Sequence, residues 1–255
     1  MEWWNDNGGF FGAKYMLGDN SLRGYLPGQS ETLDTRTNRE VEGIIDLLDI
    51  KGFEKIIDVP CGYGRHSIAL ANKGFDVIGY DINEEHLTFG QKLIKKQILH
   101  KQDMRYLPKD DADIVLNLFF SFGFFNDEEN FRVMQGFYNS LKVGGQVLIH
   151  TNVSPEMIQY RGIDYKPRVR PLADNKTLII NESYNSGTKR LEGTWTIKEG
   201  DKETKLTPFS VRIYTAEEFK QLAQEAGFTT AQTYGSFIKE DFTPSSSELI
   251  LVGRK

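Results

Sequence analysis

Short apolar runs alternate with longer amphipathic runs between residues 41 and 151. The apolar runs predict buried strands at Lys55–Val59, Phe75–Tyr80, Ala112–Leu118 and Gly145–His150. The amphipathic runs predict helices at Arg65–Lys73, Glu84–Gln97 and Asp127–Leu141. Strands that alternate with helices pair in parallel through right-handed crossovers, and the helices cover both faces of the sheet. The pattern therefore predicts an α/β fold with a doubly wound, mainly parallel sheet.

The periodicity changes between Lys176 and Tyr214, where three segments alternate apolar and polar residues with a period of two. Glycine-containing turns separate them at 185–187 and 199–201. This segment predicts an antiparallel β meander inserted into the α/β frame. The frame resumes at Thr215, which has a capping-box spacing to Glu218, and residues 248–253 predict a last, antiparallel strand.

The chain of 255 residues is near the upper limit for one hydrophobic core, which favours one domain carrying an insertion. We expect residues 41–152 and 215–255 to form the α/β domain and residues 153–214 to form the insertion. Residues 1–40 are rich in aromatic residues and glycine and have little periodicity, so they predict an N-terminal flap.

The formal net charge of −5 argues against a non-specific nucleic-acid-binding protein, which needs a basic surface. The single cysteine, Cys61, has no partner for an internal disulfide, as is typical of a reducing compartment. The N-terminus lacks the pattern of a signal peptide, and the longest charge-free apolar stretch, residues 114–125, is too short for a membrane helix. These features predict a soluble, cytoplasmic protein that binds neither membrane nor nucleic acid.

The junction of the first predicted strand and its helix carries the most informative motif, Asp58 to Ser67. Gly62 and Gly64 allow close approach of a ligand, and the helix start favours an anionic group. Asp58 ends the first strand, and Asp81 ends the next strand, from which a carboxylate can hold both hydroxyls of a ribose. The two acids suit a ligand with an amino-acid tail at one end and a nucleoside at the other.

A third short strand is predicted before Gln102, Asp103 and Met104. A carboxylate there can accept a hydrogen bond from the exocyclic amine of adenine, while Met104 packs on the ring. With these motifs, the sequence resembles the class I S-adenosylmethionine-dependent methyltransferases over residues 41–151 and 215–255. The motifs that follow the family's order are Asp58–Gly64, Asp81, Gln102–Met104 and Ile114–Phe119.

Three further stretches are similar to a bacterial subgroup that has a small antiparallel insertion over the active site: Arg65–Ser67, Phe119–Phe125 and Arg212–Thr215. The resemblance implies a Rossmann-like fold, methylation of a small molecule, S-adenosylmethionine as cofactor and S-adenosylhomocysteine as product. No metal is expected. Pro60 and Cys61 depart from the small residue pair that is commoner in the wider family, and we take this pair as a trait of the subgroup.

The resemblance also implies roles along the cofactor. Asp58 would bind the amino group and Asp81 the ribose, with Ile82 against the adenine and Asn117, Leu118 and Phe119 beside the sulfonium. The implied cofactor-binding residues are Asp58, Pro60, Cys61, Gly62, Gly64, Asp81, Ile82, Gln102, Asp103, Met104, Asn117, Leu118 and Phe119. Arg36 or Arg39 is a candidate partner of the cofactor carboxylate, the alternative being a solvated helix start.

Aromatic side chains are expected to form the acceptor pocket, because methyl transfer from a sulfonium needs alignment more than a catalytic triad. The predicted substrate-binding residues are Tyr15, Phe122, Phe124 and Tyr214. Each phenylalanine has a core position as its alternative, and the tryptophans Trp3 and Trp4 predict either a flap or a dimer contact.

An acceptor hydroxyl or ammonium group must lose a proton, so we also considered a general base. His150, at the end of its strand, is the first candidate, and Tyr214 is a second. The alternative for His150 is a hydrogen-bonded structural role.

Together these features predict a methyltransferase that acts on an oxygen or nitrogen atom of a small molecule. One alternative is an NAD(P)-dependent oxidoreductase, because Gly62, Gly64 and Ser67 approximate the dinucleotide motif and Asp81 follows Gly62 by 19 residues. Ser67 in place of the third glycine argues against it. A second alternative is a non-catalytic cofactor-binding scaffold. An exposed strand edge in the meander is also compatible with a homodimer.

Overall fold

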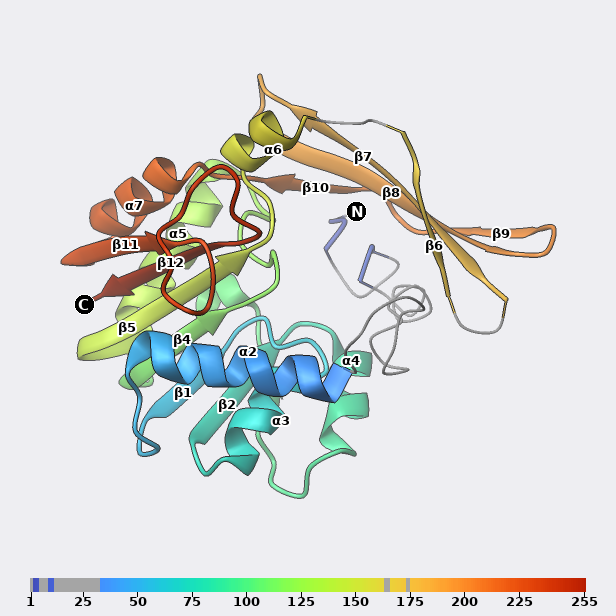
Figure 1. Ribbon diagram of the computed structural model, residues 1–255. Helices are drawn as coiled ribbons and strands as arrows, with labels where there is room; N and C mark the ends of the chain where they lie inside the picture. The colour runs from blue at the N-terminus through green and yellow to red at the C-terminus, as the bar shows by residue number, and fades with distance from the viewer. Residues whose placement is uncertain (1, 5–8, 12–32, 163–165, 173–174) are drawn as a thin grey trace.

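The computed structural model describes residues 2–4, 9–11, 33–162, 166–172 and 175–255. Its described residues form two sheets, which Figure 1 shows side by side. Sheet A has seven strands in the order β11-β12-β5-β4-β1-β2-β3. Sheet B has the order β10-β8-β7-β6, and β9 pairs with β8.

The strands of sheet A are β1 (Lys55–Asp58), β2 (Asp76–Asp81), β3 (Leu99–Lys101), β4 (Ala112–Asn117), β5 (Leu141–Thr151), β11 (Thr230–Tyr234) and β12 (Leu249–Arg254). The strands of sheet B are β6 (Arg168–Pro171), β7 (Thr177–Asn185), β8 (Arg190–Glu199), β9 (Lys202–Lys205) and β10 (Phe209–Arg212). The helices are α2 (Leu33–Leu48), α3 (Arg65–Asn72), α4 (Glu84–Gln91), the short 3₁₀ helix η2 (Met104–Tyr106), α5 (Asp127–Ser140), α6 (Pro155–Arg161) and α7 (Ala216–Glu225).

Sheet A confirms the predicted doubly wound α/β architecture. β1 pairs in parallel with β2 and with β4, and β4 pairs in parallel with β5. β12 is antiparallel to both β5 and β11, as predicted for the last strand. The chain runs outward from β1 to β3 and then returns to β4, so the strand order reverses between β1 and β4. Ligands of such folds bind at the carboxyl ends of the strands near this reversal.

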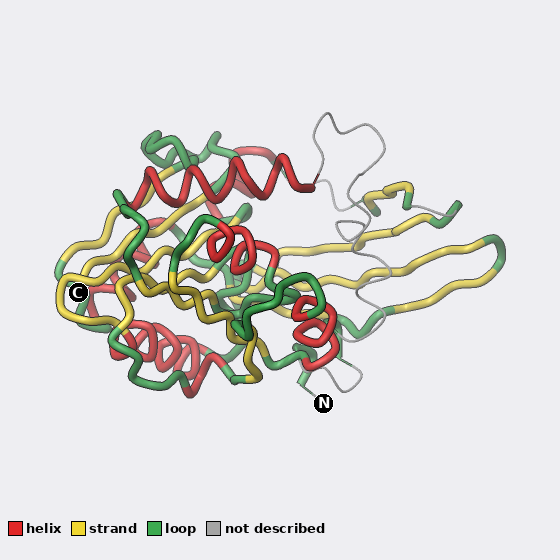
Figure 2. The backbone as a smooth tube through the Cα atoms, turned by 90° about the horizontal axis from the view of Figure 1, so that it is seen from below, coloured by secondary structure: helices red, strands yellow, loops and turns green. Residues whose placement is uncertain are grey.

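Apolar layers cover both faces of sheet A, with helices on either side of the yellow strands in Figure 2. On one face, Val41 and Ile44 of α2 and Leu70 of α3 are fully buried against the sheet. On the other face, Phe137 of α5 and Phe219 of α7 belong to a core cluster that continues into sheet B. Among the described residues, no helix is both long enough and apolar enough to cross a membrane.

Several element boundaries differ from the sequence-based predictions. α4 ends at Gln91 and not at Gln97, and the Gln91 side chain donates from Nε2 to the carbonyl oxygens of Ile94 and Lys96 in the loop that follows. The insertion forms five strands, whereas three were predicted. The two strands that the prediction missed are the exposed β6 and the charged β9, because neither has an apolar face that would produce a period-two pattern. The polar strand β11 was missed for the same reason.

The predicted start of α7 is confirmed in detail. Thr215 accepts a hydrogen bond from the backbone N–H of Glu218, whose side chain accepts one from the Thr215 N–H in return. This capping box satisfies two donors at the helix start. The helix is followed by Gly227 with a φ of 111°, a conformation that favours glycine.

Candidate functional site

A cavity of about 290 Å³ opens at the carboxyl ends of β1, β2, β3 and β4. It is lined by the loops that follow these strands, by the N-terminal residues Trp4 and Phe11, and by Arg36 of α2. The predicted cofactor residues on its wall are Asp58, Pro60, Cys61, Gly62, Asp81, Ile82, Gln102, Asp103, Met104, Leu118 and Phe119. Gly64 and Asn117 lie next to this wall in the chain but do not line it. The individual roles of these residues remain predictions.

Asp58 is fully buried at the end of β1. Its Oδ2 accepts a hydrogen bond of 2.5 Å from the hydroxyl of Ser67, the residue that replaces the third glycine of the dinucleotide motif. Burial, reinforced by the nearby charge of Asp81, raises the pKa of Asp58 to about 7, although Ser67 opposes the change. The cavity wall therefore carries a buried carboxyl group that is readily protonated near neutral pH.

Asp81 joins two loops at the end of β2. Its Oδ2 accepts from the backbone N–H of Gly62 at 2.7 Å, and its Oδ1 accepts from the backbone N–H of Asn83 at 2.8 Å. Gly62 has a φ of 58°, and a side chain there would point into open space. Asp81 thus fixes both the glycine loop and the loop after β2, and it lies on the cavity wall.

Asp103 and Met104 follow β3, where Met104 is buried and Asp103 accepts the N–H of Arg105 at 2.9 Å. The side chain of Gln102 donates to the carbonyl oxygen of Tyr106 at 2.7 Å. The sequence-based prediction placed all three at the base of a nucleoside, and the structure places them together on one wall.

Phe119 follows β4 and is surrounded by cationic and aromatic groups. Its ring stacks on His66 with centroids 5.1 Å apart, and the guanidinium carbons of Arg65 and Arg36 lie 4.7 and 5.1 Å from its centre. Phe119 and Phe120 have φ values of 56° and 61°, which bulky residues adopt only under constraint. Such backbone strain is concentrated at functional sites.

Glu40 of α2 organises the cations beside Phe119. It is 3% exposed and accepts hydrogen bonds from Arg65 at 2.6 Å, Arg36 at 2.7 Å and His66 Nε2 at 3.0 Å. Burial would raise the pKa of Glu40, but the hydrogen bond from His66 and the charge of Arg65 outweigh it and lower the pKa to about 2. Burial and the charge of Arg65 lower the pKa of His66 to about 4, so His66 is neutral at pH 7 and donates its Nε2–H to Glu40.

Sequence reasoning missed Glu40. The only local signal was its position four residues after Arg36 on one helix face, which is common on solvated helices. Its partners Arg65 and His66 come from α3, and only the packing of α2 on α3 brings them together.

Replacing Glu40 with Gln is expected to lower the free energy of unfolding at pH 7 by about 2 kcal/mol, because the partly buried Arg65 and the more exposed Arg36 lose a buried, charged partner. Since the pKa of Glu40 is lowered to about 2, its contribution is present above pH 4.5 and is lost as the pH falls toward 2. Urea unfolding of Glu40→Gln at pH 7 and pH 3 measures both effects. Glu42→Gln, on the exposed side of α2, is the matched control and should change stability by less than about 0.5 kcal/mol.

His150 is not brought to the cavity. Its Nδ1 accepts the backbone N–H of Phe119 at 3.1 Å, and its ring is 2% exposed between Phe119 and Phe237. This geometry supports the alternative we left open, a hydrogen-bonded structural residue, and disfavours the predicted role as a base.

Two of the predicted aromatic residues also lie away from the cavity wall. Tyr214 and Phe122 pack against each other and against Phe219 in the core, and burial raises the pKa of Tyr214 to about 12. Neither residue lines the cavity, whereas Phe124 does. Tyr15 lies outside the described residues.

The aromatic wall comes from two separate segments. Phe124 of the loop after β4 stacks on Phe11 at 5.5 Å and contacts Trp3 edge-on at 5.0 Å. The side chain of Asn83 donates to the carbonyl oxygen of Phe11 at 2.5 Å, which ties this N-terminal segment to the loop after β2. The packing favours an intrachain role for the N-terminal aromatic residues over a dimer contact.

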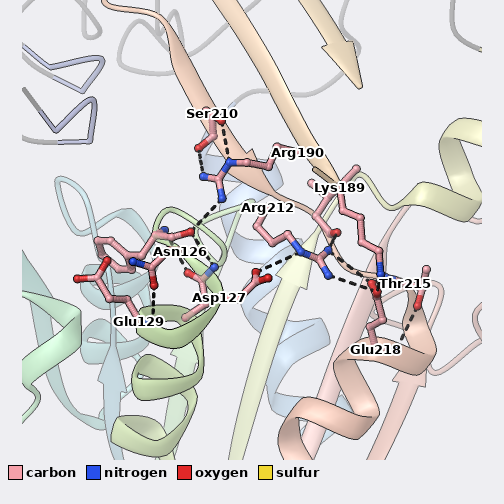
Figure 3. A network of polar contacts seen from close by, with 12 residues as sticks. Asn126, Asp127, Glu129, Lys189, Arg190, Ser210, Arg212, Thr215 and Glu218 are labelled. Carbon is pink, nitrogen blue, oxygen red and sulfur yellow. Dashed lines mark hydrogen bonds and ion pairs between the residues drawn. The ribbon is translucent and has the colours of Figure 1, made fainter. Parts of the chain in front are cut away.

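Two arginines of sheet B, Arg190 and Arg212, connect that sheet to the loop after β4 and to the helices α5 and α7 (Figure 3). Arg190 of β8 donates to the carbonyl oxygen of Phe125 at 3.0 Å and to Ser210 Oγ at 2.8 Å. Arg212 of β10 pairs with Asp127 at the start of α5 and, at 3.3 Å, with Glu218 of α7. The insertion therefore holds the loop that carries Phe124 and Phe125.

Comparisons with known proteins agree with this geometry. Residues 56–145 match the family model described as "Methyltransferase domain". The chain is 25% identical over 205 residues to the cypemycin N-terminal methyltransferase of a Streptomyces species, covering 77% of this chain and 81% of that protein. It is 28% identical over 214 residues to the glycine/sarcosine N-methyltransferase of Halorhodospira halochloris, covering 80% and 76%.

A solved structure shares the fold. The CcbJ methyltransferase from Streptomyces caelestis superposes with a TM-score of 0.72 and 17% sequence identity, covering 86% of this chain and 88% of that one. This similarity and the mainly parallel sheet A confirm the predicted α/β fold class.

Proposed function

We propose that this S-adenosylmethionine-dependent methyltransferase methylates a nitrogen or oxygen atom of a small-molecule acceptor, and that an amino nitrogen is the preferred atom. The observation that carries this proposal is one cavity with two acids at neighbouring strand ends and an aromatic wall opposite them. The acids would hold the methyl donor, and the wall would receive the acceptor.

The residues present fit the donor. The open space at Gly62 leaves room for a ligand against the loop, and the Asp81 carboxylate lies on the cavity wall at the end of the neighbouring strand, where it can accept from the hydroxyls of a ribose. Ile82 and Met104 offer apolar surface for a base, and Asp58 offers a carboxyl group for an ammonium. Arg36 reaches the cavity and is the candidate for the donor's carboxylate. When bound, the cofactor supplies a methyl group that its sulfonium already activates.

The chain's own residues would then align the acceptor and exclude water. Good alignment alone supplies about 7–11 kcal/mol of barrier reduction. Trp4, Phe11, Phe124 and Phe125 form an apolar surface that suits this task, and aromatic rings stabilise nearby cations such as a protonated amine by about 0.5–2 kcal/mol.

An amino acceptor fits best because it needs no strong base. A neutral amine already carries the attacking lone pair and can lose its proton to solvent after transfer. His66, the histidine on the wall beside Phe119, has a pKa lowered to about 4 and is a weak base. Two sequence relatives, an N-terminal methyltransferase and a glycine/sarcosine N-methyltransferase, support the same preference.

The oxidoreductase and scaffold alternatives gain no support from the geometry. Ser67 fills the position of the third dinucleotide glycine, and its hydroxyl is committed to Asp58. A non-catalytic scaffold would not need an aromatic acceptor wall that the insertion holds in place. Here Arg190 of the insertion holds the loop of Phe125 in that wall.

We assign residues 41–152 and 215–255 to cofactor binding and residues 153–214 to covering the acceptor. The predicted boundary of the flap at residue 40 falls inside α2, so residues 33–40 belong to the cofactor-binding part and not to the predicted flap. We also propose that the protein acts on a small molecule and not on nucleic acid, and that two copies of it associate as a homodimer. Size-exclusion chromatography with light scattering tests whether the homodimer forms.

Transfer of a radiolabelled methyl group from S-adenosylmethionine tests the proposed acceptor class. The panel should pair each amine with its hydroxyl counterpart, for example amino sugars with sugars and N-terminally free peptides with acetylated ones. We expect label in the amines and little in their counterparts. Label in catechols alone would contradict the preference for nitrogen, and label in RNA alone would contradict a small-molecule acceptor.

A further inference from the structure

Arg105 lies outside the cavity wall, yet it contacts residues from four segments around it. Its side chain is 13% exposed. The guanidinium holds the Asp103 carboxylate through Nη2 at 2.7 Å and through Nε at 3.1 and 3.2 Å. Its Nη1 donates to Glu129 of α5 at 2.8 Å, and Glu2 lies 3.9 Å from the same nitrogen.

Two aromatic rings of the cavity wall also lie against this guanidinium. The Arg105 guanidinium carbon is 4.8 Å from the ring centre of Trp4 and 4.7 Å from that of Phe125. The two rings meet edge-on at 5.2 Å. Arg105 therefore contacts both the N-terminal segment and the loop after β4, the two segments that supply the aromatic wall.

An arginine suits this position better than a lysine. A planar guanidinium can hold a carboxylate with two hydrogen bonds while its face stacks on aromatic rings, and an ammonium cannot do both. The hydrogen bonds that Arg105 donates to Asp103 and Glu129 raise its pKa above the usual value of a guanidinium, so the cation persists at every physiological pH. Without it, Asp103 and Glu129 would lose their shared partner.

We propose that Arg105 is a positioning residue that fixes both Trp4 and Asp103 on the cavity wall and so sets how long the cofactor stays bound. Asp103 is oriented by the guanidinium edge, and Trp4 is held by its face. Both residues line the cavity, and both depend on one side chain that does not. The inference concerns retention of the cofactor and does not depend on the identity of the acceptor.

The test measures release of radiolabelled S-adenosylhomocysteine after a chase with unlabelled ligand. We expect Arg105→Met and Trp4→Leu each to release the ligand about 10-fold faster than the parent. Arg105→Lys, which keeps the charge without the planar fork, should behave like Arg105→Met. Arg132→Met, on the exposed side of α5 where Arg132 pairs with Glu128, is the matched control and should leave the rate unchanged.

The double variant Arg105→Met/Trp4→Leu separates positioning from general destabilisation. If both residues act through one contact, the double variant releases the ligand no faster than the faster single variant. Two effects that multiply, or single variants within twofold of the parent, would overturn the inference. The acceptor plays no part in this assay, so its result is independent of the proposed acceptor class.

A second readout needs no ligand. In a background with Trp3→Phe and Trp195→Phe, Trp4 is the only tryptophan, since the chain contains three. We expect Arg105→Lys, the variant that disturbs folding least, to increase acrylamide quenching of Trp4 in the empty protein at least twofold. Unchanged quenching in a folded Arg105→Lys protein would show that Trp4 is held without Arg105 and would overturn the inference.

Discussion

Replacing Asp81 with Ala is expected to lower the affinity for S-adenosylhomocysteine about 1000-fold. The carboxylate fixes the glycine loop through the N–H of Gly62 and the loop after β2 through the N–H of Asn83. The same carboxylate lines the cavity and is the predicted partner of the ribose hydroxyls. Loss of two charge-assisted hydrogen bonds is worth about 4 kcal/mol, which corresponds to about a 1000-fold change in Kd.

Titration calorimetry with S-adenosylhomocysteine measures this effect. Asp81→Asn keeps one acceptor oxygen and should lose less affinity than Asp81→Ala. Asp76→Ala is the matched control, because Asp76 begins the same strand and its exposed carboxylate pairs only with Lys96 among the described contacts. A folded Asp81→Ala protein whose Kd is within tenfold of the parent would remove Asp81 from the cofactor site.

The sheet and the position of the cavity were predictable because both follow from local pattern. β1, β2, β4 and β5 are strongly apolar, and parallel strands bring their carboxyl ends to one edge. Acids at the ends of β1 and β2 must therefore lie close together. That argument needs no knowledge of side-chain contacts, and the cavity lies where it predicted.

The acceptor side was less predictable because it depends on which way a side chain points. His150 is the next-to-last residue of β5, at the correct edge of the sheet, but its side chain is on the same strand face as Leu148. It therefore packs against Phe119 and does not line the cavity. Phe122 and Phe124 are two residues apart in one loop, and Gly123 between them approaches β10 so closely that a Cβ would meet the Arg212 carbonyl oxygen at 2.0 Å. Only the insertion decides that Phe124 faces the cavity and Phe122 the core.

The ion-pair clusters could not be predicted from spacing. Arg105 collects partners from the N-terminus, from α5 and from its own loop, and Glu40 collects partners from two helices. Each pairing depends on tertiary packing, while in the sequence each residue looks like an ordinary surface charge. These two clusters are also where single substitutions should have effects larger than the sequence suggests.

Asp58→Asn is expected to stabilise the empty protein and at the same time to weaken cofactor binding. Burial raises the pKa of Asp58 to about 7, so between about pH 4 and pH 7 the folded protein keeps a proton that the unfolded chain has released. Stability contributed by this group therefore falls as the pH rises through that window and stays low above it. Asparagine is neutral at every pH and can still accept the hydrogen bond from Ser67.

We expect Asp58→Asn to raise the free energy of unfolding at pH 8 by about 3 kcal/mol and to change it little at pH 4.5, because the penalty of the buried charge exists only at the higher pH. Asp113→Asn is a control in which the change in stability should have the opposite sign. Burial would raise the pKa of Asp113, but Lys142 and the Lys55 N–H lower it, so this substitution should destabilise the protein at pH 8.

Affinity for S-adenosylhomocysteine should fall at least tenfold in Asp58→Asn at pH 8, since an ammonium group gains more from a buried carboxylate than from an amide. Binding of that ammonium would lower the pKa of Asp58, so in the parent protein binding should release protons between pH 6 and pH 7. Calorimetry in buffers of different ionisation enthalpy detects that release, and it should vanish in Asp58→Asn. A variant that is less stable than the parent at pH 8, or that binds as tightly, would show that the buried carboxyl group is a structural element of the loop and does not meet the cofactor.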